Sequence, residues 1–387
     1  MRKASTKTFL SGNVYETALD RIRWLYDEFD NRVAVSSSGG KDSTVVVFLA
    51  LTVARERGAL PLKVQWLDQE CEFDATVRYQ SQMADHPDID FEWYQIPFRL
   101  FNATNHDAEW LNVWGEGEEW VRPKDPRAIH ENTFGTDRFV DLLQAIGKET
   151  GGVTLTGVRS EESPGRRLGM TGAASYRWAT WGSRYPTHHV MHPIYDWTYR
   201  DVWKAIYDGD DPEHPGEQSW PYNSMYDLQH RYGVHQRDMR VSNYHHETAI
   251  KHLFYLQEAE PETWEKATAR LEGISTAGHL GTDDFYVKEL PFMFGSWVEY
   301  HAYLVEHLIT DPEHRQIFRK QFDTMARTLP YLDVEKIAGA AVQHVIANDL
   351  YGTKAGNFIV CYRDAEADAA WRAAHPKTPE TVDAQAS

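Results

Sequence analysis

The stretch with the clearest chemical character covers residues 36–43, Ser-Ser-Ser-Gly-Gly-Lys-Asp-Ser. Two adjacent glycines, Gly39 and Gly40, let backbone N–H groups approach an oxyanion closely. Lys41 adds a positive point charge, and two side chains can donate hydroxyl hydrogen bonds. These hydroxyl donors are Ser38 and Ser43. The residue types and their spacing therefore predict a phosphate-binding loop.

The flanking segments must position this loop. Residues 32–37 include an apolar run typical of a buried parallel strand, and the apolar residues 44–54 are long enough for a helix. The helix N-terminus would add free N–H donors and a positive dipole end. The alternative is a hydrophilic hairpin turn with Ser43 as a helix cap, but the flanks do not suit two hairpin strands. A Walker A loop is excluded because Val35 occupies its first glycine position.

Two further segments place polar residues after predicted strands. Asp68 and Glu70 follow a strand at residues 62–67, and ligands of open parallel sheets bind beyond the carboxyl ends of strands. Alternatively, these acids cap a helix at residues 72–84. A strand at residues 153–156 precedes a second polar segment, residues 157–167.

Guanidinium groups in that second segment could bind phosphate or sulfate through paired hydrogen bonds. Arg159 and Arg166 are the candidates. The alternative is that they only form surface ion pairs with Glu161 and Glu162. The histidines of residues 188–192 could suggest a metal site, but a short histidine run needs further ligands, so we interpret them mainly as structural.

Composition bounds the classes of function. The 387 residues carry a formal charge of −18, which argues against binding nucleic acid through its phosphate backbone. Only Cys71 and Cys361 are present, so one chain has no disulfide framework and no four-cysteine iron–sulfur cluster. There is no apolar run that would span a membrane and no signal-peptide pattern, so we expect a cytoplasmic location without membrane binding.

The loop also resembles a known motif. Residues 38–43 are similar to the PP-loop of the ATP pyrophosphatase (adenine nucleotide alpha hydrolase-like) superfamily, in the branch of phosphoadenosine-phosphosulfate (PAPS) reductases. Residues 157–166 resemble that branch's Gly-x-Arg-x-x-x-Ser-x-x-Arg motif, and residues 193–203 resemble its strand-turn-helix segment, with Thr198 as the N-cap. Residues 222–227 resemble its Asn-x-x-Tyr-Asp segment. Residues 260–266 are similar to a bacterial and phage subgroup described as PAPS sulfurtransferases.

The resemblance implies an α/β fold: a doubly wound, mostly parallel sheet of the HUP type with a helical C-terminal extension. We expect a nucleotide-binding domain at residues 1–210 with an insertion at about 97–135, whose tryptophans either stack on a base or, as we favour, form a hydrophobic plug. A mainly helical region would follow at residues 211–364. Residues 365–387 are small and polar, which predicts a disordered tail.

The resemblance also assigns roles within the site. Lys41, Asp42, Arg159 and Arg166 would be catalytic, and Asp42 would help to hold the Mg²⁺ that accompanies ATP. The remaining contacts with an adenine nucleotide would come from these residues: Ser36, Ser38, Gly39, Gly40, Ser43, Asp68, Glu70, Gly157 and Ser163. Cys361 lacks the Glu-Cys-Gly context of PAPS reductases, so we do not expect this chain alone to reduce PAPS.

Three functions remain open at this point. The first is cleavage of ATP between its α- and β-phosphates, which releases pyrophosphate and activates an acceptor. The second is binding of PAPS for sulfur transfer, with the thiol supplied by a partner. The third is a non-catalytic nucleotide-sensing module that binds another protein, and the resemblance points to a ParB-like nuclease-domain protein encoded beside such chains.

Overall fold

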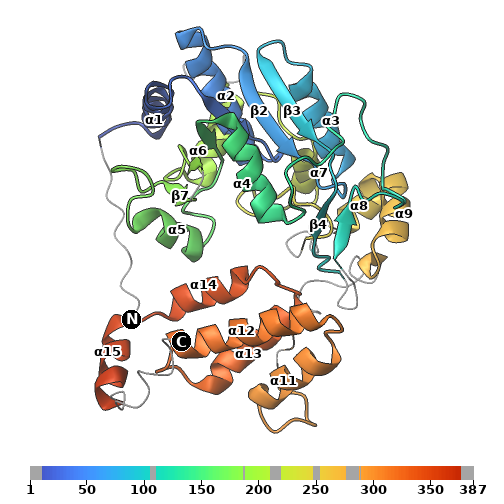
Figure 1. Cartoon of the computed structure of the whole chain (residues 1–387), viewed down its shortest axis with the longest axis vertical. Helices are drawn as coiled ribbons and strands as arrows, with labels where there is room; N and C mark the ends of the chain where they lie inside the picture. The colour runs from blue at the N-terminus through green and yellow to red at the C-terminus, as the bar shows by residue number, and fades with distance from the viewer. Residues whose placement is uncertain are drawn as a thin grey trace. The chain divides into compact units, whose positions relative to one another are not determined.

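The computed structural model describes residues 11–104, 110–185, 188–209, 219–246, 253–275, 287 and 289–375. The chain divides into two compact units (Figure 1). Unit 1 comprises Met1–Leu100, Asn112–Tyr244 and Phe254–Arg270, and unit 2 comprises Phe101–Leu111, His245–Leu253 and Leu271–Ser387. Unit 1 thus continues beyond residue 210, where the sequence predicted its end.

Unit 1 is built on a six-stranded sheet in the order β3-β2-β1-β6-β8-β7. Its strands are β1 (Val33–Ser36), β2 (Leu62–Leu67), β3 (Ile89–Tyr94), β6 (Val153–Leu155), β7 (Gly182–Arg184) and β8 (His189–Met191). All neighbours pair in parallel except β7, which runs antiparallel to β8 at the edge. The predicted α/β fold class with a mostly parallel sheet is therefore confirmed.

The order of the strands creates a switch point in the sheet. From β1 the chain adds β2 and β3 on one side, and it then returns to add β6 and β8 on the other side. The loops that follow β1 and β6 therefore leave the carboxyl ends of these two strands in opposite directions. Ligands of open α/β sheets bind in the space between such loops. The predicted phosphate loop follows β1, and the predicted arginine segment follows β6.

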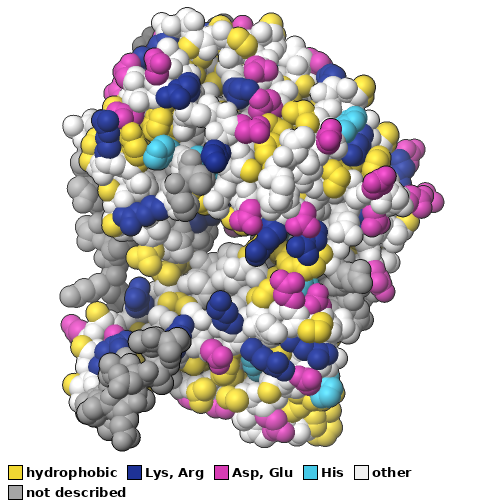
Figure 2. All heavy atoms as spheres, viewed as in Figure 1, with side chains coloured by type: hydrophobic (Ala, Val, Ile, Leu, Met, Phe, Trp, Pro, Cys, Tyr) yellow, Lys and Arg dark blue, Asp and Glu magenta, His cyan; other side chains and the backbone are white. Residues whose placement is uncertain are grey.

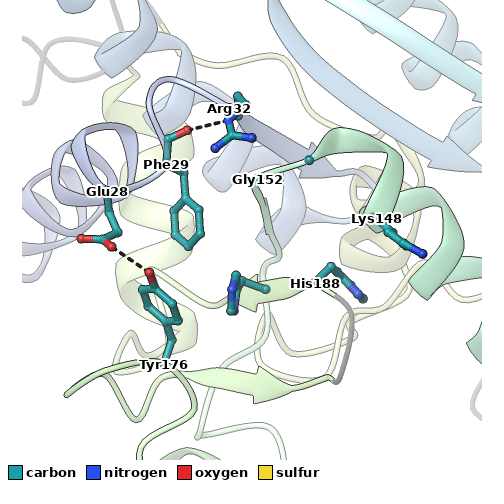
Figure 3. Close-up of a pocket in the computed structure, with 10 residues that line it drawn as sticks. Glu28, Phe29, Arg32, Lys148, Gly152, Tyr176 and His188 are labelled. Carbon is teal, nitrogen blue, oxygen red and sulfur yellow. Dashed lines mark hydrogen bonds between the residues drawn. The ribbon is translucent and has the colours of Figure 1, made fainter.

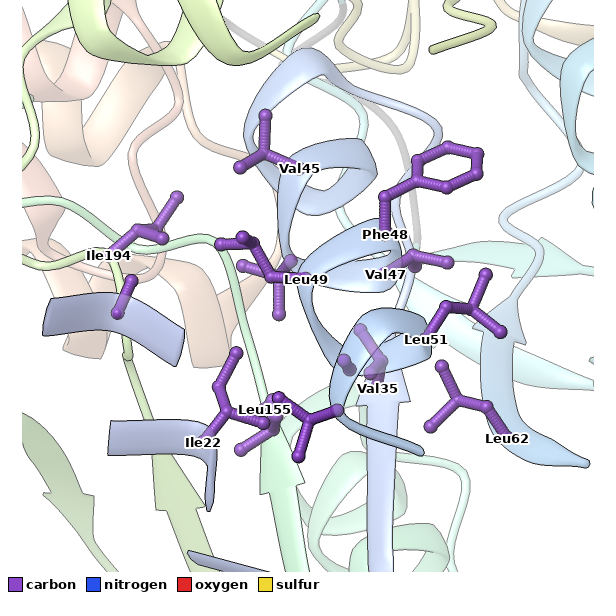
Figure 4. Packing of buried hydrophobic residues seen from close by; sticks show 14 of the residues in the cluster. Ile22, Val35, Val45, Val47, Phe48, Leu49, Leu51, Leu62, Leu155 and Ile194 are labelled. Carbon is purple, nitrogen blue, oxygen red and sulfur yellow. The ribbon is translucent and has the colours of Figure 1, made fainter. Parts of the chain in front are cut away.

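Helices surround this sheet. Those that lie wholly or largely in unit 1 are α1 (Val14–Glu28), α2 (Lys41–Arg57), α3 (Asp74–Ala84), α4 (Phe139–Thr150), α5 (Pro164–Thr171), α6 (Tyr199–Asp208), α7 (Met225–Arg231), α8 (Leu253–Ala259) and α9 (Pro261–Arg270). The helix α2 is buried on nearly every side because it packs against the sheet and against α1 and α6. Figure 4 shows its apolar side chains, such as Val45 and Leu49, among Val35, Leu155 and Ile194.

This packing fixes the start of α2, and therefore the loop, relative to the sheet. Each fully buried valine or leucine side chain contributes about 1.5–3 kcal/mol through burial of apolar surface. The predicted N-cap of α6 is confirmed, because Thr198 and Asp201 form a reciprocal capping box there.

Among its described residues, the insertion at residues 97–135 carries a two-stranded sheet of β4 (Phe98–Leu100) and β5 (Leu111–Val113). Trp114 is fully buried, and Trp120 packs on it with ring centroids 5.7 Å apart. These tryptophans fill the interior of the insertion, as the hydrophobic-plug interpretation predicts.

Unit 2 is helical, with its own cores. Its helices are α11 (Trp297–His307), α12 (Pro312–Thr328), α13 (Val334–Ile346), α14 (Thr353–Tyr362) and α15 (Ala365–Ala374). Apolar residues of α11, α12 and α13 form one core, and Met325 and Leu329 belong to a second. The helix α15 differs from the predicted disorder after residue 365, because Asp364 caps an alanine-rich turn. Residues 376–387 of that tail lie outside the described residues.

Two properties of the surface and helices bear on partners. None of the helices within the described residues is long and apolar enough to cross a membrane. On the face shown in Figure 2, acidic and basic side chains are interspersed, and described residues form no broad basic area there.

Candidate nucleotide site

The loop between β1 and α2 has a tightly specified backbone. Gly39 adopts φ of +71°, a left-handed conformation, and a Cβ there would lie 2.8 Å from Thr76 Cγ2. The Ser43 hydroxyl lies 3.1 Å from the Ser38 hydroxyl and donates to the Gly40 carbonyl oxygen at 2.9 Å. Ser38 is the exposed residue of this pair, and Ser43 is buried. The sequence prediction brought these residues together correctly as one turn, whereas Ser36 ends β1 itself.

Lys41 takes a different position from the one expected of a phosphate-binding lysine. Its side chain is only 2% exposed. The ammonium donates to the Met239 carbonyl oxygen at 3.2 Å and lies 3.2 Å from Asp42 Oδ2. The Lys41 backbone N–H donates to the Tyr226 hydroxyl at 2.8 Å. Lys41 therefore places its charge beneath the loop and under the start of α2.

The central contact joins the two predicted segments. Arg159 Nε donates to Asp42 Oδ1 at 2.6 Å, which links the segment after β6 to the first turn of α2. Arg159 Nη1 also donates to Glu161 Oε2 at 3.0 Å. Gly157 makes this approach feasible, because a Cβ at that position would lie 2.6 Å from the Asp42 carbonyl carbon.

Electrostatics keep the pair ionised. Burial alone would raise the pKa of Asp42, but the charges of Lys41 and Arg159 outweigh it and hold that pKa below its ordinary value. Burial likewise opposes the charge on Arg159, and Asp42 with Glu162 nevertheless raises the Arg159 pKa. The result is a fixed, alternating set of charges under the loop.

Arg166 and Ser163 lie on the rim of this arrangement. The Ser163 hydroxyl caps α5 by accepting from the Arg166 backbone N–H at 3.1 Å. The Arg166 side chain is 47% exposed and forms an ion pair with Glu162. Glu162 also accepts from the Arg159 backbone N–H at 2.9 Å, so one carboxylate connects both arginines. The ion-pair alternative considered for these arginines is thus present, and it coexists with the Asp42 contact.

The predicted acidic contacts, Asp68 and Glu70, are arranged differently. Both side chains are fully buried, and among the described residues neither carboxylate has a hydrogen bond to residues 36–43. Asp68 accepts from Trp93 Nε1 at 2.8 Å and pairs with Arg122 of the insertion.

The Glu70 carboxylate also finds its hydrogen-bond and ion-pair partners in the insertion and in α9. It accepts from the Trp114 backbone N–H at 2.9 Å and pairs with Arg270 at 2.9 Å. These bonds hold the insertion and α9 against the end of β2. They give both acids a structural role that neither the nucleotide interpretation nor the helix-cap alternative described.

Asp42 does not fit the predicted magnesium role. One carboxylate oxygen faces Arg159 and the other faces Lys41, so two cations already occupy the positions that a metal would need. Within the described residues there is also no cluster of three or more histidine, cysteine or acidic side chains suited to a metal ion. His189 is the first residue of β8, and His188 and His192 flank that strand.

The sequence analysis missed several residues that complete the loop. Asn223 Nδ2 donates to Thr76 Oγ1 at 2.8 Å and to the Gly39 carbonyl oxygen at 3.3 Å. Tyr226, in the first turn of α7, accepts from the backbone N–H of Lys41. The Asn-x-x-Tyr-Asp resemblance at residues 222–227 was the available signal, although it carried no position in space.

A loop of this kind at the switch point of a parallel sheet defines an α/β domain of the nucleotide-binding class. The chain belongs to the phosphoadenosine phosphosulfate reductase domain family, whose family model matches residues 32–229. The resemblance inferred from the motifs is therefore confirmed.

Curated relatives include proteins of different names. The uncharacterized protein YbdN of Escherichia coli is 26% identical over 320 residues, which cover 78% of this chain and 76% of the relative. A phosphoadenosine 5′-phosphosulfate reductase of Xylella fastidiosa is 26% identical over 51% of this chain and 73% of the relative. A sulfate adenylyltransferase subunit 2 of Pseudomonas syringae is 27% identical over 48% of this chain, and the match spans 59% of that subunit.

Solved structures give more distant matches. The phosphate complex of a PAPS reductase from Candida auris is 13% identical, with a TM-score of 0.33, over 62% of this chain and 98% of that one. An FMN adenylyltransferase of Candida glabrata with FMN and an ATP analogue is 10% identical, with a TM-score of 0.34, over 57% of this chain and 62% of that one.

Proposed function

We propose that this protein is an adenine-nucleotide-binding enzyme that cleaves ATP between its α- and β-phosphates and transfers the adenylyl group to an acceptor. One observation carries the proposal. The glycine loop after β1 and the arginine segment after β6 meet at the switch point, where Arg159 lies 2.6 Å from Asp42. A phosphate bound at this point would meet the N-terminus of α2.

The nucleotide would be held by groups of the loop itself. We assign the phosphates to the backbone N–H groups of Gly39 and Gly40 and to the hydroxyls of Ser38 and Ser43. Arg166 is the exposed cation of the set and could exchange Glu162 for a phosphate. Lys41 and Arg159 would act from beneath as fixed positive charges rather than as direct ligands.

The reaction would proceed by displacement at the α-phosphorus. An acceptor oxygen forms a bond to that phosphorus, the bond to the bridging oxygen breaks, and pyrophosphate leaves with the electron pair. Preorganised positive charge stabilises the negative charge that develops on the leaving group. The similarity to a sulfate adenylyltransferase subunit supports adenylyl transfer as the reaction class. No residue of the chain is assigned to magnesium.

A second candidate is binding of PAPS for sulfur transfer, which the similarity to a PAPS reductase favours. Cys71 is unsuited to attack the sulfonucleotide, because it is fully buried and burial raises the pKa of its thiol well above the ordinary value. Cys361 is exposed but lacks the Glu-Cys-Gly context, so this candidate would use an external thiol, for example from a partner protein. A nucleotide-sensing module that binds such a partner would show binding without turnover.

Labelled ATP distinguishes the candidates. We expect ATP carrying an α-phosphate label to yield AMP or an adenylylated acceptor together with pyrophosphate. Release of inorganic phosphate and ADP alone would contradict the proposal. Calorimetry with ATP, PAPS and 3′,5′-bisphosphoadenosine tests the second candidate, since only that candidate predicts a preference for the 3′-phosphate.

A matched pair of variants locates the site. Arg166→Gln should weaken binding of ATP about tenfold, because it removes one charge-assisted contact with a phosphate. Arg138→Gln, which changes an exposed arginine at the start of α4, should leave binding unchanged. Equal affinity in both variants would remove Arg166 from the site.

A further inference from the structure

A separate pocket of unit 1 lies at the amino ends of the strands, opposite the end that carries the nucleotide loop. Its cavity of about 390 Å³ lies where β1, β6 and β8 begin, between the ends of α1 and α4. The nucleotide loop instead follows the last residue of β1, so the strand separates the two places. A cavity of this size falls within the range of small-molecule sites.

One side of the pocket is aromatic. Phe29, Tyr176 and His189 pack together, with ring centroids of Tyr176 and His189 4.4 Å apart and those of Phe29 and Tyr176 5.2 Å apart. Figure 3 shows Phe29 and Tyr176 on one side of the space and Lys148 with His188 on the other. Tyr176 and His189 are partly exposed, so their rings can contact a ligand.

Positively charged side chains outnumber negatively charged ones among the residues that line the pocket. Arg32 and Lys148 line it, and within the described residues neither has an acidic group within 4.0 Å. The one acid, Glu28, accepts from the Tyr176 hydroxyl at 2.7 Å and pairs with Arg177 at 2.7 Å. Arg32 Nε donates to the Phe29 carbonyl oxygen at 3.2 Å, which fixes the guanidinium beside the aromatic side.

His188 adds an independent sign of a polar site. Its side chain is 8% exposed, and its Nδ1 atom is buried without a hydrogen-bond partner among the described residues. Buried polar atoms are rarely left unsatisfied, and a bound polar group or water is a common reason for an exception. The ring packs directly on α4, because a Cβ at Gly147 would lie 2.6 Å from its Cδ2 atom.

We propose that this pocket binds a small anion that carries an aromatic ring, with the ring against Tyr176 and the anionic group attracted by the positive charges of Arg32 and Lys148. The alternative is that both cations only compensate the negative ends of α1 and α4. That alternative accounts for neither the cavity nor the partly exposed aromatic side. The proposal does not depend on the function assigned to the nucleotide loop.

Phenyl phosphate and inorganic phosphate are suitable probes for the full chain. Calorimetry should show tighter binding of phenyl phosphate, and hydrogen–deuterium exchange should show protection of amides in residues 147–152 and 176–177. Equal binding of the two probes would overturn the role of the ring. Protection confined to residues 36–43 would overturn the site.

Variants separate binding from folding. The double variant Arg32→Gln, Lys148→Gln should weaken binding of phenyl phosphate at least about tenfold, since it removes two charged contacts. Lys266→Gln, an exposed change on α9, is the control and should have no effect. Tyr176→Ala should weaken binding, and Tyr176→Phe should retain it. Unchanged affinity in the double variant would overturn the proposal even if Tyr176→Ala fails to fold.

Discussion

Arg159 Nε lies 2.6 Å from Asp42 Oδ1, and the two residues are 117 positions apart in the chain. Their side chains are 3% and 18% exposed, so the ion pair is largely removed from water. The contact joins the start of α2 to the segment after β6, and it therefore couples the shape of the nucleotide loop to the arginine segment.

We expect the stability losses from removing the two partners of this pair to be non-additive. Asp42→Asn should lower the free energy of unfolding by about 3 kcal/mol, because it removes the carboxylate charge that Arg159 and Lys41, two buried cations, share. The double variant Asp42→Asn, Arg159→Met should lose less than the sum of the single changes. Urea unfolding of the four proteins in the cycle gives the coupling energy.

An exposed pair provides the comparison. Arg99 and Asp137 lie 2.7 Å apart but are 38% and 53% exposed, so Asp137→Asn should change the free energy of unfolding by less than about 1 kcal/mol. A loss at Asp42 as small as the loss at Asp137 would show that the Asp42–Arg159 pair does not brace the loop.

Two glycines on neighbouring segments should respond in opposite directions to alanine. Gly157→Ala forces a methyl group to within 2.6 Å of the Asp42 backbone, so we expect loss of nucleotide binding and a lower melting temperature. Gly169 lies in α5, and a methyl group added there would meet no atom within 4 Å, so Gly169→Ala should raise stability by about 0.5–1 kcal/mol. Thermal melts and ATP calorimetry check both. Normal ATP affinity in Gly157→Ala would refute the need for a close approach there.

Glu72 should make the stability of unit 1 depend on pH. Burial, and then the charge of Asp68, raises the pKa of Glu72 from 4.5 to about 8. Between pH 4.5 and pH 8 the folded chain keeps a proton on Glu72 that the unfolded chain has released. The free energy of unfolding therefore falls as the pH rises through this range. Glu72→Gln keeps a neutral side chain and removes this titration. Urea unfolding at pH 5 and pH 8 should show a pH-dependent loss that is smaller by roughly 3 kcal/mol in the variant.

The control for this prediction is Glu119→Gln, which changes an exposed acid of the insertion. It should retain the pH dependence of the unchanged protein. If Glu72→Gln also retains it, Glu72 is ionised in the folded chain at neutral pH and the prediction fails.

Unit 2 should be sensitive to acid for a related reason with the opposite sign. Burial lowers the pKa values of His301 and His344 from 6.5 to about 4, and His301 Nε2 and His344 Nδ1 have no partner among the described residues. Below pH 6.5 the unfolded chain binds protons that the folded chain does not, so the free energy of unfolding falls as the pH drops toward 4.

Removal of one histidine tests this. Between pH 7 and pH 4.5, the free energy of unfolding should fall by roughly 2–3 kcal/mol less in His344→Leu than in the unchanged protein. Circular dichroism during urea unfolding at the two pH values is the measurement. Parallel losses in both proteins would assign the acid sensitivity to other groups.

Much of the fold could be predicted because its signals are local. Residues 62–67 form β2 over the predicted range. Gly58 and Pro61 precede this short segment and Asp68 follows it, so it is too short for a helix and suits a buried strand. The boundaries of α2 were less accurate. The helix begins at Lys41 rather than Thr44, because Gly40 provides its N-cap and polar residues can occupy a first turn.

The candidate site was predicted only in part. The loop was found because its residues are consecutive, and Arg159 was found because its motif lies beside a strand. Asp68 and Glu70 were assigned to the nucleotide on the same reasoning, yet both are buried against Arg122 and Arg270. Nothing local to residues 68–70 indicates partners that lie 54 and 200 positions further along the chain.

Local sequence was sufficient to define the strand, the glycine turn and the helix of residues 32–57, because backbone conformation and periodicity act between near neighbours. Folding of the whole chain was needed to establish what that loop faces. The order of the strands brought Arg159 to Asp42, and the return of the chain placed Asn223 and Tyr226 against Gly39 and Lys41. The physical reason is that charge pairing and packing depend on distance in space, which the spacing of residues along a chain does not encode.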